Sequence, residues 1–131
     1  MNWMRFAAVV LGAGVVTTFT DWFFAGDWLH ARLSYPEIWR KGNTARAVAL
    51  SMPLPFITSA AFAVLAWKLD VEGLKNCVKL AAAIWAIAPL PLILANAVFI
   101  KLPRPFVISY VAGWLVKLLI VAVAVAKFLR Y

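Results

Sequence analysis

The amino-acid sequence predicts an all-α fold: a transmembrane up-down four-helix bundle with kinked second and third helices and an interfacial segment after the first helix. Of the 131 residues, 66% are hydrophobic, which is more apolar surface than a soluble domain of this length can bury. The apolar residues fall into four segments, each near the roughly 20 residues that a helix needs to cross a hydrocarbon core. Residues 1–131 therefore form a single four-span domain.

The four predicted spans leave little sequence between them. The first, Phe6–Phe24, is interpreted as a retained helix because Phe23 breaks the small-residue pattern of a signal-peptide cleavage site. The others are Ala45–Trp67, Asn76–Ile100 and Phe106–Lys127. The last two connections are short, which favours antiparallel neighbours in an up-down bundle. An even number of spans places both termini on one side.

Both middle spans contain a Pro-x-Pro near their centres, Pro53 with Pro55 and Pro89 with Pro91. Proline has no amide N–H and crowds the carbonyl four residues earlier, so each pair predicts a kink. In lipid, the carbonyls that lose their donor need another one. The functional alternative to a simple kink is a ligand cavity or gate beside the unwound backbone.

The connection 25–44 is long and rich in charged and aromatic residues. If it is helical, His30 and Glu37 share one face, while Trp28 and Trp39 lie on another. Aromatic residues beside charges at the end of a span are typical of an element that lies in the membrane interface. The sequence therefore predicts an interfacial segment here.

The net charge of +8 comes from lysines and arginines that flank the predicted spans. Such residues contact lipid headgroups, so membrane lipids are the expected partners and nucleic acid is not. Counted by predicted side, six basic residues lie on each face, and the positive-inside rule does not choose an orientation. The expected location is the bacterial inner (cytoplasmic) membrane, as a multi-pass protein.

Asp21 and Lys117 are the candidate ionisable residues in the interior of predicted spans, where a charge needs a partner. Lys117 is at the centre of its span, and Asp21 is six residues from its own centre, about 9 Å along the helix axis. Small residues at helical spacing accompany both: Gly14 precedes Asp21, and Gly113 precedes Lys117. Because small residues let helices approach closely, the two stripes are expected to face each other. The sequence therefore predicts a buried Asp21–Lys117 ion pair.

Other polar residues are predicted at the same depth. Asn96 and Tyr110 are in the half of the membrane that contains Asp21, with His30 and Glu37 above them in the first connection. The candidate ligand-binding or coupling residues are therefore Asp21, His30, Glu37, Asn96, Tyr110 and Lys117. They would form a polar half-membrane pocket. No catalytic residue and no metal site are assigned.

The run TDWFFAGDWLHARLSYPEIWR, followed later by APLPLILANAVFIKL, resembles an uncharacterised group of small bacterial four-span integral membrane proteins. The resemblance covers nearly the whole chain and implies the same architecture, with no activity attached. The residues that carry its motif are Asp21, Trp22, Gly26, His30, Pro36, Glu37, Trp39 and Arg40.

Three functions are compatible with these patterns. The first is a structural or accessory subunit, or a binder of a lipid-like or amphipathic small molecule. The second is a small proton-coupled transporter using Asp21, by analogy with small multidrug resistance transporters, whose acid is deeper in the first helix. The third is a membrane-embedded enzyme using Asp21, His30 and Glu37. No cofactor is predicted beyond a bound lipid or quinone-like molecule, and a homo-oligomer or larger membrane complex is the alternative to lipid alone as partner.

Overall fold

The computed structural model describes residues 2–27 and 44–129, and these are almost entirely helical. Within these residues, four helical segments are long and apolar enough to cross a membrane. They are Trp3–Phe24, Ala49–Lys68, Leu74–Phe99 and Arg104–Phe128. The predicted all-α four-helix fold is therefore confirmed, and the span boundaries agree with the predicted ones within a few residues.

The first span begins as α1, Trp3–Asp21, and continues as a short π-helix, η1, Trp22–Asp27. The Asn2 side chain caps α1 by accepting from the amides of Met4 and Arg5. Threonine hydroxyls that bond the preceding turn bend and loosen a helix, and Thr20 donates to the Thr17 carbonyl 2.9 Å away. The change from α- to π-geometry occurs immediately after Asp21. The sequence analysis did not foresee it.

Both predicted kinks are present. The second span is divided into α3, Thr44–Ser51, and α4, Leu54–Lys68. The third is divided into α5, Leu74–Ile87, and α6, Pro89–Phe99, with Ala88 between them at φ −119° and ψ −72°. The breaks fall at the prolines because Pro53 and Pro89 donate no amide to the preceding turn.

The turn between α4 and α5 is tight and well defined. The amide of Val71 donates to the Ala66 carbonyl at 2.9 Å, and that of Asp70 donates to the Trp67 carbonyl at 3.1 Å. This bond pair is a Schellman motif, which requires a left-handed residue after the helix. Asp70 occupies that position at φ 52°. The chain reverses direction within a few residues.

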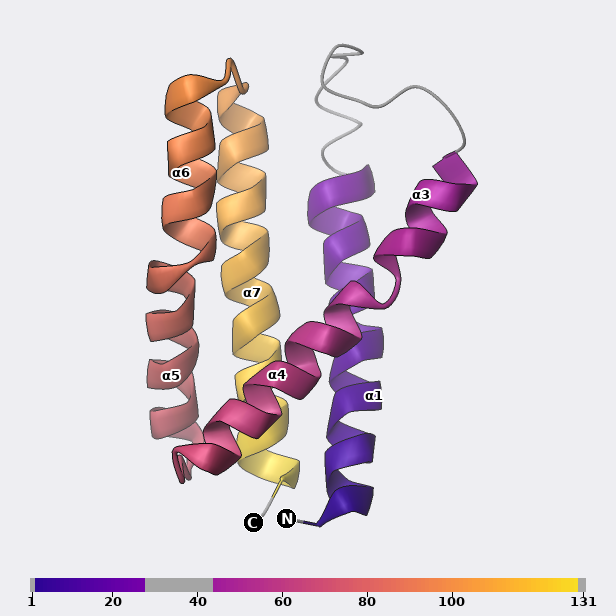
Figure 1. Ribbon diagram of the computed structural model, residues 1–131, viewed down its shortest axis with the longest axis vertical. Coiled ribbons are helices and arrows are strands. Elements are labelled where there is room, and N and C mark those ends of the chain that lie inside the picture. Colours follow the sequence, from indigo (N-terminus) through magenta and orange to yellow (C-terminus); the bar gives the residue numbers. More distant parts are fainter. Residues whose placement is uncertain (1, 28–43, 130–131) are drawn as a thin grey trace.

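The fourth span, α7, Arg104–Phe128, is the centre of the packing. It contacts α1, η1, α4, α5 and α6. Its lower half supplies Val121, Ala122 and Val125 to a core that also includes Phe62 and Cys77. In Figure 1, α7 stands between α1 on one side and the stacked α5 and α6 on the other.

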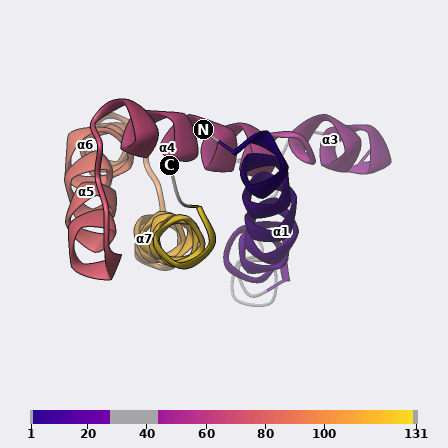
Figure 2. The same ribbon diagram turned by 90° about the horizontal axis from the view of Figure 1, so that it is seen from below.

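The up-down order holds, but one expected neighbour pair does not. Figure 2 shows α1, α7 and α5 in a row, with α4 lying obliquely across one side of that row. α4 packs mainly on α1, and extended packing between α4 and α5 is absent among the described helices. The short connection thus joins α4 and α5 at their ends only. The two helices diverge from this turn and leave space between them.

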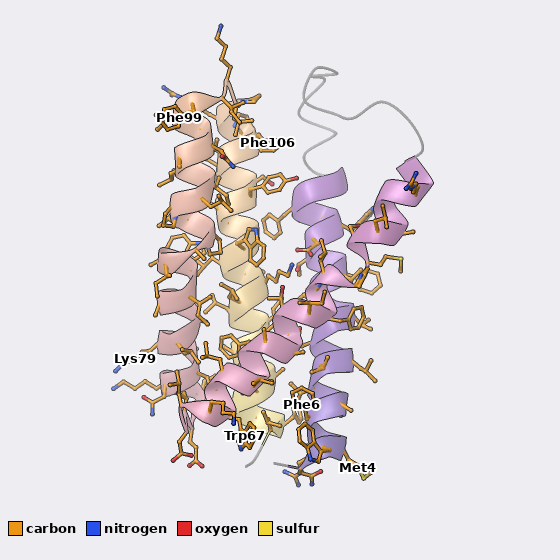
Figure 3. The ribbon with its side chains drawn as sticks, in the orientation of Figure 1. Met4, Phe6, Trp67, Lys79, Phe99 and Phe106 are labelled. Carbon is orange, nitrogen blue, oxygen red and sulfur yellow. The ribbon has the colours of Figure 1, made fainter. Side chains whose placement is uncertain are left out.

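The two ends of the bundle carry different landmarks. The N- and C-terminal described residues lie at the same end (Figure 1), as an even number of spans requires. Figure 3 places Met4, Phe6 and Trp67 at this end, with Phe99 and Phe106 at the other. Aromatic side chains at both ends are typical of spanning helices. The predicted interfacial segment lies mostly outside the described residues.

Candidate functional site

The predicted ion pair between the first and fourth spans is confirmed. The Lys117 ammonium donates to Oδ2 of Asp21 at 3.0 Å. The Lys117 side chain is 5% exposed, and that of Asp21 is 38% exposed. The pair joins two helices that are 96 residues apart in the chain. It places a fixed positive charge in the interior of the bundle and its counter-charge nearer the surface.

An aromatic ring completes the surroundings of the lysine. The Lys117 ammonium lies 4.4 Å from the centroid of the Trp114 ring. A cation over an indole face is attracted by the negative face of the ring, most strongly where water is excluded. Trp114 and Lys117 are three residues apart on α7, so they occupy one helical face. The lysine is therefore held by a carboxylate and an indole together.

The threonines of α1 do not extend this polar cluster. Thr17 donates to the Ala13 carbonyl at 2.7 Å, and Thr18 donates to the Gly14 carbonyl at 2.7 Å. Such bonds back to the preceding turn satisfy the hydroxyl within its own helix. Among the described residues, the ion pair is thus the polar side-chain contact that joins α1 to α7.

Tyr110 and Ser109 lie on α7 about two turns before Lys117. The half-buried Tyr110 ring stacks on Phe106 with centroids 4.4 Å apart. The Ser109 hydroxyl donates to the Phe24 carbonyl of η1. Ser109 thereby ties α7 to the π-helix directly above Asp21. Both residues are on the side of the bundle expected from their depth.

The two glycines of the predicted stripes have different partners. A Cβ on Gly113 would be 3.0 Å from Cβ of Phe24, so Gly113 does bring α7 close to the end of the first span. A Cβ on Gly14 would be 2.2 Å from the Phe56 ring of α4. The expectation that Gly14 faces the fourth span is therefore wrong. Gly14 makes room for Phe56, and it sets the crossing of α1 with α4.

Asn96 does not join Asp21. It lies on α6 with an exposed side chain, and α6 packs on α5 and α7. Depth counting alone placed it in the pocket, but depth does not determine which face of a helix points inward. The predicted lid residues His30 and Glu37 lie outside the described residues. Of the six candidates, the structure thus brings Asp21 and Lys117 into contact, and Tyr110 lies about two turns before Lys117 on α7.

A second feature is an apolar groove of about 460 Å³ between α4, α6 and α7. Its walls come from α4, α6 and α7, with Ile84 near the end of α5. Its volume is in the range of small-molecule pockets, roughly 300–1,000 Å³. The lining residues are Ile57, Thr58, Ala61, Phe62, Leu65, Ile84, Ala88, Pro89, Leu92, Ile93, Trp114 and Leu118.

The groove lies beside one of the two predicted proline kinks. Ala88 and Pro89, which form the break in the third span, line the groove. The break in the second span, at Met52–Pro53, does not. The cavity beside unwound backbone was thus predictable at one of the two Pro-x-Pro sites. The other walls were missed because they depend on the tilt of α4, which the sequence pattern does not specify.

The groove and the ion pair share one residue. Trp114 lines the groove, and its ring also contacts the Lys117 ammonium. Anything that moves the indole therefore acts on both features. Sequence analysis missed Trp114, although its position three residues before Lys117 was a usable signal.

Metal chemistry has no visible donor set in the described part of the chain. Residues 2–27 and 44–129 contain no group of three His, Cys, Asp or Glu side chains that could hold a metal ion. The enzyme alternative uses Asp21, His30 and Glu37, and the last two of these residues are outside that part.

Comparison with known proteins found no matching family model, no similar curated protein and no similar solved structure.

Proposed function

We propose that this chain is a bacterial inner-membrane protein that binds the hydrocarbon tail of an amphipathic membrane molecule in the groove between α4, α6 and α7. The observation that carries the proposal is the groove itself: about 460 Å³ of apolar-lined space between the middle portions of three spans. A polar, water-soluble ligand would bind poorly in this groove, because the lining residues offer few polar partners. A hydrocarbon chain would match it.

The location of the groove supports a ligand that arrives from the lipid phase. Ala88 and Pro89 are near the middle of Leu74–Phe99, and Trp114 and Leu118 are near the middle of Arg104–Phe128. In a bilayer these residues are surrounded by hydrocarbon, not by water. The groove therefore accepts molecules that diffuse laterally within the membrane. Phospholipids and isoprenoid lipids both carry a suitable tail.

Native mass spectrometry of the full chain, released from its membrane in a mild detergent, tests this function. Ala61 lines the groove and Ala83 lies exposed on α5 outside it, so Ala61→Phe fills the groove while Ala83→Phe is a matched control. We expect wild type and Ala83→Phe to retain a bound lipid-like molecule and Ala61→Phe to lose it. Fragmentation of the bound species distinguishes a phospholipid from an isoprenoid. Equal retention by all three proteins would reject the groove as the binding site.

Proton coupling through Asp21 is a second candidate, and the open side of its carboxylate favours it. Lys117 engages only Oδ2, and more than a third of the Asp21 side chain is exposed. A proton taken up by Asp21 would break the pair and leave Lys117 without its counter-charge. Infrared difference spectra between acidic and neutral pH should then contain a protonated-carboxyl band that is missing in Asp21→Asn. Identical spectra for the two proteins would eliminate this candidate.

A further inference from the structure

Two tryptophans near the groove differ in how their indole N–H groups are used. The Trp85 indole donates to the Val111 carbonyl at 3.1 Å, which ties α5 to α7. Trp114 lines the groove, and its indole N–H has no hydrogen-bond acceptor among the described residues. The contact between Trp114 and Lys117 uses the face of the ring, so it does not occupy the N–H.

The Trp114 N–H, which is unpaired within the described part of the chain, is important because no other lining residue has an available hydrogen-bond donor. Thr58 is the only other lining residue with a polar side chain, and its hydroxyl donates to the Leu54 carbonyl at 3.1 Å. An indole N–H is a donor and never an acceptor. A polar group left unpaired in apolar surroundings is unfavourable. The groove is therefore complementary to a molecule with an apolar body and a hydrogen-bond acceptor.

The depth of Trp114 in the membrane limits which molecules can bring a hydrogen-bond acceptor to it. Trp114 is two residues from the centre of α7, about 3 Å along the helix axis. The hydrocarbon core extends about 15 Å to either side of the midplane, and the ester carbonyls of phospholipids lie at its edges. An uncharged ring with carbonyl groups, attached to a hydrocarbon tail, can enter the middle of the core.

We propose that the groove binds a tail-bearing quinone, with a ring carbonyl oxygen accepting a hydrogen bond from the Trp114 indole N–H. The proposal rests on the groove being a binding site, as proposed above, and it names the class of ligand. A quinone ring provides acceptors without a donor, which matches the lining. Trp114 would be the residue that distinguishes a quinone from a plain hydrocarbon chain.

The test uses two probes and four proteins, wild type with Trp114→Phe, Trp85→Phe and Ala61→Phe, in nanodiscs made from quinone-free phospholipid. The probes are a decyl-substituted benzoquinone and decylbenzene, which has the same tail and a ring without carbonyls. Trp114→Phe keeps an aromatic ring but removes the N–H. Trp85→Phe removes an N–H that already has a partner and does not line the groove, so it is the matched control. Empty nanodiscs provide the correction for partition into lipid.

We expect the quinone to bind wild type and Trp85→Phe equally, and Trp114→Phe about tenfold more weakly, the loss of one net hydrogen bond. Decylbenzene should bind these three proteins alike, which also shows that Trp114→Phe is folded. The infrared carbonyl band of bound quinone should lie at lower frequency in wild type than in Trp114→Phe.

Two outcomes would overturn the proposal, and they differ from failure of the groove itself. Quinone binding that is unchanged in Trp114→Phe would reject the hydrogen bond. A parallel loss of quinone and decylbenzene would show that Trp114 contributes shape alone. If Ala61→Phe weakened neither probe, the groove would not be a binding site, and the proposed function would fail with it.

Discussion

Lys117 is held between two partners, since its ammonium lies 3.0 Å from Oδ2 of Asp21 and 4.4 Å from the centroid of the Trp114 ring. Removing one member of a buried ion pair leaves a charge without compensation and costs roughly 3–5 kcal/mol. We expect Asp21→Asn to destabilise more than Lys117→Met, because the charge that it leaves behind is the deeply buried one. Unfolding of the reconstituted protein in mixed micelles measures both.

The double variant Asp21→Asn with Lys117→Met decides whether the two residues act as a pair. If they do, the double variant recovers much of the free energy of unfolding that either single change loses. Additive losses would show that the carboxylate and the ammonium stabilise the bundle independently, and the contact between them would then have no energetic role.

The crossing of α1 with α4 depends on the missing side chain at Gly14. A Cβ there would be 2.2–2.8 Å from three atoms of the Phe56 ring, closer than van der Waals contact allows. We expect Gly14→Ala to reduce the free energy of unfolding by about 1–3 kcal/mol, as overpacked cores do. Thermal unfolding in detergent measures the change.

Gly12 provides the control for this substitution, because it is on the same helix and a Cβ there meets nothing within 4 Å. Gly12→Ala should stabilise α1 by up to about 1 kcal/mol, the difference in helix propensity. Equal effects at positions 12 and 14 would indicate that helix propensity, not the Phe56 contact, determines the result.

The architecture was predictable from the sequence because it follows from one-dimensional patterns. Apolar segment length determines the spans, and Pro53 and Pro89 mark the breaks, since a missing N–H acts locally. The Asp21–Lys117 pair was also predictable, because two intramembrane charges of opposite sign in one small bundle have few other partners.

The faces and tilts of the helices were not predictable in the same way. Asn96 has the expected depth but an exposed side chain, since its orientation depends on how α6 rotates against α7. Gly14 makes room for the Phe56 ring because α4 crosses α1 obliquely. The groove depends on how α4 and α5 diverge. The relative direction of two helices cannot be predicted from the sequence of either helix by itself. The place of Trp114 in the groove wall likewise follows only from this arrangement of the helices.

The bond from Ser109 to the Phe24 carbonyl should stabilise the junction of α7 with η1. Ser109→Ala would leave this carbonyl without its side-chain donor, so we expect a loss of about 1 kcal/mol. Thr58→Val is a comparison in which the hydroxyl bonds only its own helix, and its effect should be smaller. Hydrogen exchange of the η1 amides provides a local measurement. Unchanged exchange in Ser109→Ala would show that the π-helix does not depend on this bond.

Pro89 connects the kink of the third span to the groove, because it breaks the helix and also lines the cavity. Pro89→Ala restores an amide that can donate to the Trp85 carbonyl, so we expect α5 and α6 to become more nearly collinear. Spin labels at the exposed positions Lys79 and Phe99, in a Cys77→Ala background, should then move apart. The reshaped groove should retain less of the bound lipid-like molecule in native mass spectra.

Pro103→Ala, at the cap of α7 outside the groove, should change neither measurement. An unchanged label distance in Pro89→Ala would mean that packing against α7, and not the missing amide, maintains the bend.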